Sequence, residues 1–150
     1  MSDTFTNILV HCVFSTKGRV ATISEDIQPK LWAYLGGIAR TNKFRALQVG
    51  GTSDHVHALI ALPADMPASK AVQLLKGGSS KWLHEQGVNV WWQAGYGAFS
   101  IGVSQQAATT RYIREQEQHH RKRDFRNEFA DFLKAHGVVT KLDEFESHEP

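Results

Sequence analysis

The stretch Asp54-His55-Val56-His57-Ala58-Leu59-Ile60-Ala61-Leu62 decides the fold of this chain. It is typical of a buried β-strand, and because strand side chains alternate, His55 and His57 should point to the same side. The residues between and after them should point toward an apolar core: Val56, Ala58, Ile60 and Leu62. Two imidazoles side by side on a rigid strand can form half of a divalent-metal site. Hydrogen-bonded structural histidines would fit the strand equally well.

Upstream of the histidine strand, the sequence predicts a strand, a helix and a second strand. Residues 5–15 are rich in branched apolar side chains and predict the first strand, followed by a polar turn at 16–19. Ser24 is expected to cap a helix over residues 25–41, whose apolar positions recur at helical spacing. Residues 44–49 predict the second strand, which joins the histidine strand through a turn at 50–53.

Downstream, the sequence predicts a helix over 68–85, a strand over 95–103 and helices over 105–119 and 124–135, the last ended by Gly137. Two adjacent glycines, Gly77 and Gly78, cost roughly 1 kcal/mol each inside a helix. We therefore expect a kink or a close backbone contact there. The segment 76–81 is either a patch that contacts phosphate or a break between two shorter helices.

The order β-α-β-β-α-β followed by helices predicts an α+β fold: a ferredoxin-like (split β-α-β) antiparallel sheet with additional C-terminal helices. The first and third strands of such a sheet are central. Two helices cover one face, and the histidines should face the other. We expect one domain over residues 1–150, with a core at about 5–136 and an acidic tail at about 141–150.

Composition narrows the class of protein. Hydrophobic residues make up 41% of the chain and charged residues 21%, which is ordinary for a globular protein. No apolar stretch is long enough for a membrane span, and the N-terminus lacks signal-peptide features, so a cytoplasmic protein is expected. The single cysteine, Cys12, excludes an intramolecular disulfide and a zinc site built on several thiolates. The net charge of +2 does not by itself indicate nucleic-acid binding, although the body without its acidic tail is more basic.

A tyrosine and a glutamine in the helix over 105–119 offer a second set of chemical groups. Tyr112 and Gln116 are four residues apart and should share a helical face. By itself this pair is common, and a half-buried structural tyrosine is the simpler interpretation. His11 on the first strand could approach the same face or be a hydrogen-bonded strand histidine. Asp54 could orient a histidine or serve only in the hairpin turn.

Five segments in this order resemble the small single-tyrosine transposases of the HUH superfamily, which move the simplest insertion sequences as single-stranded DNA. They are Val13-Phe14-Ser15-Thr16-Lys17, His55-Val56-His57, Lys76-Gly77-Gly78-Ser79-Ser80, residues 93–100, and Tyr112-Ile113-Arg114-Glu115-Gln116 with His119-His120-Arg121. The resemblance covers nearly the whole chain. Gly18 and the doubled glycine at 77–78 depart from the family pattern.

The resemblance implies a catalytic role for Tyr112 as the nucleophile and a metal site formed by His55, His57 and Gln116. Mg²⁺ or Mn²⁺ suits such ligands. The expected product is a covalent 5′-phosphotyrosine with a free 3′-hydroxyl, formed without a nucleotide cofactor. A free tyrosine, with a pKa near 10, is mostly protonated at neutral pH. The cation would offset the charge that develops on the phosphate.

The resemblance also implies partners. Expected are single-stranded DNA with hairpin structure and a homodimer with shared active sites, although the sequence does not decide whether Tyr112 acts within one chain or across two. No membrane partner is expected. DNA contacts are expected from six basic residues: Lys17, Arg19, Lys76, Lys81, Arg111 and Arg114.

Two alternatives share this pattern. A host-domesticated nuclease of the same superfamily would cut structured single strands without mobilising DNA. A non-catalytic ferredoxin-like module would bind nucleic acid, usually by stacking bases on exposed sheet aromatics, which the histidine strand lacks. His119 and His120 could lie near the metal, or they could form a basic helix end that contacts DNA or solvent.

Overall fold

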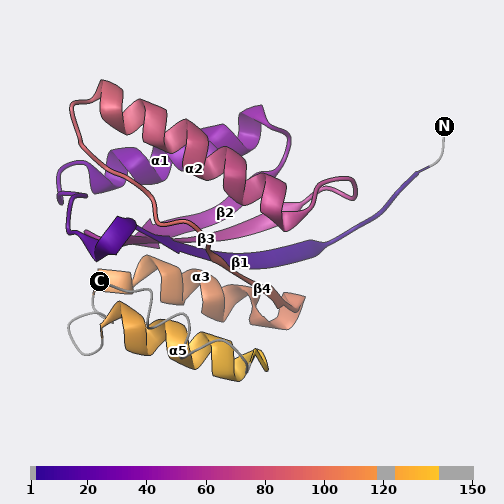
Figure 1. Cartoon of the computed structure of the whole chain (residues 1–150). Helices are drawn as coiled ribbons and strands as arrows, with labels where there is room; N and C mark the ends of the chain where they lie inside the picture. Colours follow the sequence, from indigo (N-terminus) through magenta and orange to yellow (C-terminus); the bar gives the residue numbers. More distant parts are fainter. Residues whose placement is uncertain (1–2, 118–123, 139–150) are drawn as a thin grey trace.

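The computed structural model describes residues 3–117 and 124–138, and within them four strands and four α-helices carry the fold (Figure 1). The strands are β1 (Ile8–Ser15), β2 (Arg45–Gly51), β3 (His55–Leu62) and β4 (Gly97–Ile101). The helices are α1 (Gln28–Thr41), α2 (Ala68–Glu85), α3 (Gln106–Arg114) and α5 (Phe125–Ala135). Short 3₁₀ turns occupy Lys17–Arg19 and Val103–Gln105. In this described part, no helix has the length and apolar character needed to span a membrane.

The strands form one antiparallel sheet in the order β2-β3-β1-β4, so the first and third strands are central, as predicted. In the central pair, His55 lies opposite Ser15 and His57 lies opposite Val13. The edge strand β2 has an irregularity between Ala46 and Gln48. This order confirms the α+β, ferredoxin-like fold with additional C-terminal helices.

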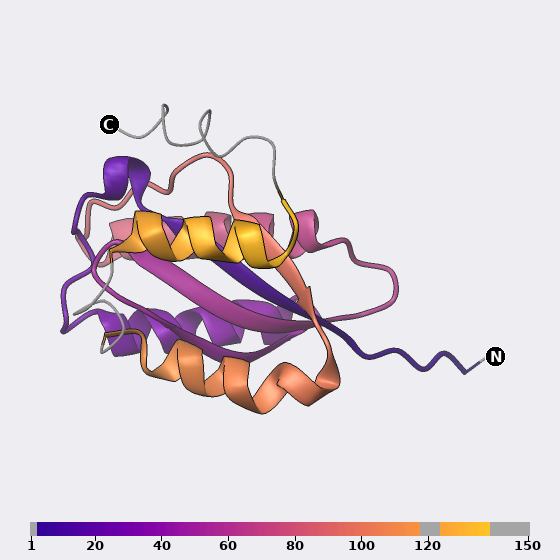
Figure 2. The same cartoon turned by 90° about the horizontal axis from the view of Figure 1, so that it is seen from below.

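Two helices lie on each face of the sheet. α1 and α2 cover one face, and α3 and α5 lie across the other (Figures 1 and 2). The main core lies under α1 and α2 and takes alternate residues of the central strands: Val10, Cys12, Phe14, Val56, Ala58, Ile60 and Leu62. Burial raises the pKa of the Cys12 thiol to about 12, in keeping with a core residue. The alternation predicted for the histidine strand is confirmed.

Two predicted helix boundaries are wrong. Ser24 does not cap α1, because its carbonyl oxygen accepts the backbone N–H groups of Ile27 and Gln28 in a turn that precedes the helix. The helix then begins at Gln28, with a proline in its first turn, a position that proline tolerates well. At the other end of the chain, α3 stops at Arg114 rather than continuing to 119.

The doubled glycine does not break α2, which continues through it. The predicted close contact is present at Gly78, where a Cβ atom would lie 2.8 Å from Cδ1 of Ile38 on α1. Gly77 faces open space. Gly78 therefore lets the two helices approach each other, and Gly77 does not have that role.

Candidate active site

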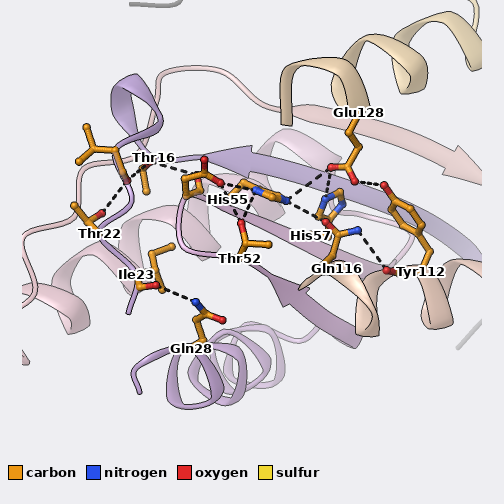
Figure 3. A network of polar contacts seen from close by, with 12 residues as sticks. Thr16, Thr22, Ile23, Gln28, Thr52, His55, His57, Tyr112, Gln116 and Glu128 are labelled. Carbon is orange, nitrogen blue, oxygen red and sulfur yellow. Dashed lines mark hydrogen bonds and ion pairs between the residues drawn. The ribbon is translucent and has the colours of Figure 1, made fainter. Parts of the chain in front are cut away.

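His55 is fixed in orientation by the turn that precedes β3. Its side chain is fully buried, and its Nδ1 lies 2.8 Å from Oδ1 of Asp54 and 3.0 Å from the hydroxyl of Thr52 (Figure 3). A carboxylate only accepts hydrogen bonds, so the contact with Asp54 places the proton on Nδ1. The lone pair of Nε2 then points into the site. Asp54 thus orients a histidine, one of the two roles that the sequence left open.

His57 is also fully buried, and His11 fixes its other ring nitrogen. Nδ1 of His57 lies 2.8 Å from Nε2 of His11. Burial and the neighbouring His57 lower the pKa of His11 to about 3, so His11 is neutral at physiological pH. His11 is therefore a hydrogen-bonded strand histidine that holds His57 in place, the simpler of the two interpretations.

Tyr112 and Gln116 both lie against the histidines, Tyr112 from the last turns of α3 and Gln116 from just after it. α3 ends at Arg114 and Glu115 is its C-cap, so Gln116 lies just beyond the helix. Its side chain is nevertheless buried, with Oε1 3.0 Å from Nε2 of His55. Its Nε2 donates to the carbonyl oxygen of Tyr112 at 3.3 Å. The ring of Tyr112 lies 5.8 Å from that of His57 in the same chain.

Glu128 on α5 is the site residue that the sequence did not reveal. Its Oε1 lies 3.0 Å from Nε2 of His57 and 3.8 Å from Nε2 of His55. Its Oε2 accepts the hydroxyl of Tyr112, so one carboxylate joins the proposed nucleophile to both histidines (Figure 3). Asp124 fixes the start of this helix by accepting the N–H of Asn127 at 2.9 Å.

A sequence signal for Glu128 was present. Phe125, Phe129 and Phe132 define the apolar side of α5, and Glu128 lies between them at helical spacing. A carboxylate on the buried side of a helix needs a partner, because an isolated buried charge is costly. That requirement predicts a polar group on the facing sheet, which here is the histidine pair.

These groups fit a hard divalent cation. The ligand atoms of His55, His57 and Glu128 all lie within 4.8 Å of one another, and Oε1 of Gln116 faces the same histidine nitrogen. Nε2 of His55, which carries no proton, points at two oxygen acceptors, an arrangement that a cation between them would relieve. Imidazole nitrogens with carboxylate and amide oxygens suit Mn²⁺ and Mg²⁺.

Aromatic rings from α5 close the site. Phe125 lies 4.7 Å from the ring of His55, and Phe132 lies edge-on to His11 at 5.0 Å and to Tyr112 at 5.7 Å. Both histidines are fully buried, and the rings of Phe125 and Phe132 lie against them.

A pocket of about 570 Å³ borders the site beside His55 and is lined by both Asp54 and Phe125. Four carboxylates line it: Glu25, Asp54, Glu117 and Asp124. Such a lining attracts cations and repels phosphate. It suits the entry of a metal ion better than the approach of DNA.

The six basic residues predicted to contact DNA differ in their surroundings. Lys17, Lys81, Arg111 and Arg114 are exposed, and Arg19 is partly buried. Lys76 is turned inward, donating to the carbonyl oxygens of Gln93 and Gly95 at 2.7 and 2.8 Å. Partial burial lowers its pKa. His119, His120 and the acidic tail over 141–150 lie outside the described residues.

Relatives place the chain among transposases. Residues 4–116 match the family model described as "Transposase IS200 like". The transposases for insertion sequence element IS200 from Salmonella typhimurium and Salmonella typhi are each 29% identical over 86 residues. Those 86 residues are 57% of this chain and also 57% of each relative.

Solved structures share the fold at lower identity. A protein from Deinococcus radiodurans that is assigned as a transposase has a TM-score of 0.62 and 19% identity, covering 77% of this chain and 95% of that one. A REP-associated tyrosine transposase bound to a REP hairpin has a TM-score of 0.58 and 18% identity, covering 80% and 74%. The family match includes both histidines, Tyr112 and Gln116, and stops before Glu128. The chain belongs to the IS200-like transposase family.

Proposed function

We propose that this chain cuts and rejoins single-stranded DNA at hairpin-marked ends through a covalent 5′-phosphotyrosine on Tyr112. One observation carries the proposal: the Tyr112 hydroxyl and both histidines meet at a single buried carboxylate, that of Glu128. Family membership supports the reaction class. The relative that is bound to a REP hairpin supports hairpin DNA as the substrate.

The residues would act in distinct roles. His55, His57, Gln116 and Glu128 would hold Mg²⁺ or Mn²⁺, which when bound would offset negative charge on the scissile phosphate and the leaving oxygen. Asp54 and His11 would keep the two imidazoles oriented.

The proposed reaction at Tyr112 exchanges one ester bond of the phosphate for another. Oη attacks phosphorus as the bond to the 3′ oxygen breaks, and the leaving 3′ oxygen gains one proton for the one that the tyrosine loses, which leaves a 5′-phosphotyrosine and a 3′-hydroxyl. Oε2 of Glu128 already accepts the Tyr112 hydroxyl and is placed to take its proton. A second 3′-hydroxyl can reverse the attack because the phosphodiester is conserved.

The alternative of a non-catalytic module has less support. Such modules present aromatic side chains on an open sheet face. Here α3 and α5 lie on the face that carries the histidines (Figure 2), and the aromatic rings on it pack against His11, His55 and Tyr112.

The test is adduct formation on a labelled, hairpin-bearing single strand with Mn²⁺ or Mg²⁺. The wild type and Tyr34→Phe, a matched change on α1 on the opposite side of the sheet, should form a covalent protein–DNA adduct. Tyr112→Phe should form none. Equal adduct from Tyr112→Phe would show that another residue is the nucleophile.

A mixing experiment addresses the arrangement of subunits. Within one chain, Tyr112 already lies beside His57, which favours a site completed in cis. Tyr112→Phe mixed with His57→Ala should then stay inactive. Recovered activity would instead support the shared sites of the expected homodimer.

A further inference from the structure

The loop over residues 90–96, between α2 and β4, is fastened along one side of α2. His84 donates from Nε2 to the carbonyl oxygen of Val90 at 2.8 Å, and Trp92 donates from its indole to the Ser79 hydroxyl at 3.1 Å. Lys76 holds the other end of the loop by donating to the carbonyl oxygens of Gln93 and Gly95. The anchoring residues Lys76, Ser79 and His84 lie on one side of α2, so the loop follows that side of the helix.

The same loop is fastened to the end of β1. Thr16 and Trp92 form a β-bridge. The backbone N–H of Gln93 donates to the carbonyl oxygen of Ser15 at 2.8 Å, and that of Lys17 donates to the carbonyl oxygen of Trp91 at 2.7 Å. Ser15 in turn lies opposite His55 in the sheet. Two strand spacings put the backbone of Gln93 roughly 10 Å from that of His55. The loop is thus rigid and close to the metal ligands.

Two aromatic side chains of this fastened loop remain exposed, although each also contacts α2: the Trp91 ring lies 5.0 Å from that of His84, and Nζ of Lys76 lies 5.9 Å from the Tyr96 ring. Trp91 is 60% exposed and Tyr96 is 42% exposed, whereas Trp92 between them packs against Phe14 in the core. An exposed tryptophan and an exposed tyrosine on a segment held by hydrogen bonds offer ring faces on which bases can stack. Within residues 3–117 and 124–138, burial in the core does not account for either side chain.

The charge around these aromatics suits a phosphate chain. Residues 86–114 contain no aspartate or glutamate. Lys17, which follows β1 and bonds to the loop backbone, is exposed, as is Lys81 on α2. This contrasts with the acidic pocket on the other side of His55. Of the two sides, the loop side is the one that a nucleic-acid backbone could approach without repulsion.

We propose that Trp91 and Tyr96 are base-stacking positions that hold the single-stranded DNA next to the scissile phosphate. The choice of ligand rests on the proposed function. Every base has a face that can stack on an aromatic ring, so the site would be tolerant of sequence and would act with phosphate contacts from Lys17. Lys76 then acts by positioning the loop, and not by contacting DNA.

The experiment compares two labelled 20-nucleotide strands of equal charge, oligothymidylate and an abasic strand without bases. Binding is measured with full-length Tyr112→Phe in EDTA, so that neither cleavage nor metal contributes. This parent protein should bind oligothymidylate at least about five-fold more tightly, in line with the energy of one stacked base. Trp91→Ala and Tyr96→Ala should each reduce that preference, and together they should remove it.

Two matched variants make the result specific. Phe5→Ala removes an aromatic side chain that is 90% exposed beyond the opposite end of β1, and it should leave the preference intact. Lys17→Ala should weaken the binding of both strands equally and reduce the salt dependence of that binding. Unchanged thermal unfolding of the loop variants would show that the loss is local.

A preference for bases that survives the double variant, or a parent protein that binds both strands equally, would overturn the proposal. Because the assay uses a protein without Tyr112 and without metal, failure of the tyrosine mechanism would not affect it. Conversely, loss of stacking would leave the adduct assay on the hairpin strand as an independent test of the proposed function.

Discussion

The two faces of the sheet differ in the polarity of the side chains that they bury. β1 and β3 supply both faces with alternate residues. The face under α1 and α2 packs against the main apolar core, in which Ser79 of α2 is a buried polar residue that accepts the indole N–H of Trp92. Among the described residues, the face under α3 and α5 buries a polar cluster between two small apolar clusters; its members include His11, His55, His57, Gln116 and Glu128.

The difference indicates a division of labour within single strands. Apolar burial stabilises the fold in proportion to area, whereas a buried polar cluster is favourable only if its members are paired. The α1/α2 face should therefore carry most of the stability. The α3/α5 face should carry the chemistry, and substitutions at five positions can test the separation.

The largest effect is expected at His57, on the polar face. His57→Ala should lower adduct formation at least about 1,000-fold, equivalent to about 4 kcal/mol, because it removes a proposed metal ligand. Metal binding is checked separately by thermal unfolding. At about 100 times its Kd, Mn²⁺ should stabilise the wild type by about 2.7 kcal/mol and the variant much less. An equal metal-induced shift in both proteins would contradict the ligand assignment.

The next largest effect is expected at Ile60, on the apolar face of the same strand. Ile60 is fully buried, so Ile60→Ala should cost about 2–5 kcal/mol in the free energy of unfolding, measured with denaturant. Adduct formation per folded molecule should change little. If it fell as far as in His57→Ala, the two faces would not be separable.

A matched glycine pair sharpens the picture of the apolar layer. Gly77→Ala places a methyl group in open space and should stabilise the protein by up to about 1 kcal/mol through helix propensity. Gly78→Ala presses on Ile38, and overpacking of about 1–3 kcal/mol should cancel or exceed that gain. Denaturant unfolding of the two variants checks the order. Equal stability of the two variants would mean that α1 can move aside at no cost in the free energy of unfolding.

The smallest effect is expected at Asp124, which caps α5. Asp124→Ala should destabilise the protein by about 1 kcal/mol, and Asp124→Asn should recover most of that loss. Chemical denaturation provides the measurement. Because α5 carries Glu128, the Ala variant should also weaken the metal-induced thermal shift slightly. If Asp124→Ala lost more free energy of unfolding than Ile60→Ala, α5 would contribute more to stability than its small apolar cluster accounts for.

The fold was predictable because its signals are local and periodic. Alternation in β3, helical spacing in α1 and α2, and the order of elements were enough to place the histidine strand at the centre of the sheet. The helix cap at Ser24 was predicted wrongly, because a capping residue type does not show whether the backbone makes a turn first. The early end of α3 has no marker in the sequence, because neither glycine nor proline directly follows Arg114.

The site was predictable only in part, for a different reason. His55 and His57 share a strand and are linked by its period, and Tyr112 and Gln116 are linked by family resemblance. Glu128 comes from another helix, so no local spacing connects it to the histidines. Lys76 shows the converse: a cation that looked free in the sequence is occupied by loop carbonyls.

The strict alternation of β3 also limits how this chain can change in length. Inserting or deleting one residue between Asp54 and Leu62 would exchange the two rows of side chains. The imidazoles would then point toward the apolar core, and valine and isoleucine side chains would point toward the site. Stability and chemistry would be lost in the same event. Changes in length are therefore tolerable only outside the strand, in connections such as the one between β3 and α2.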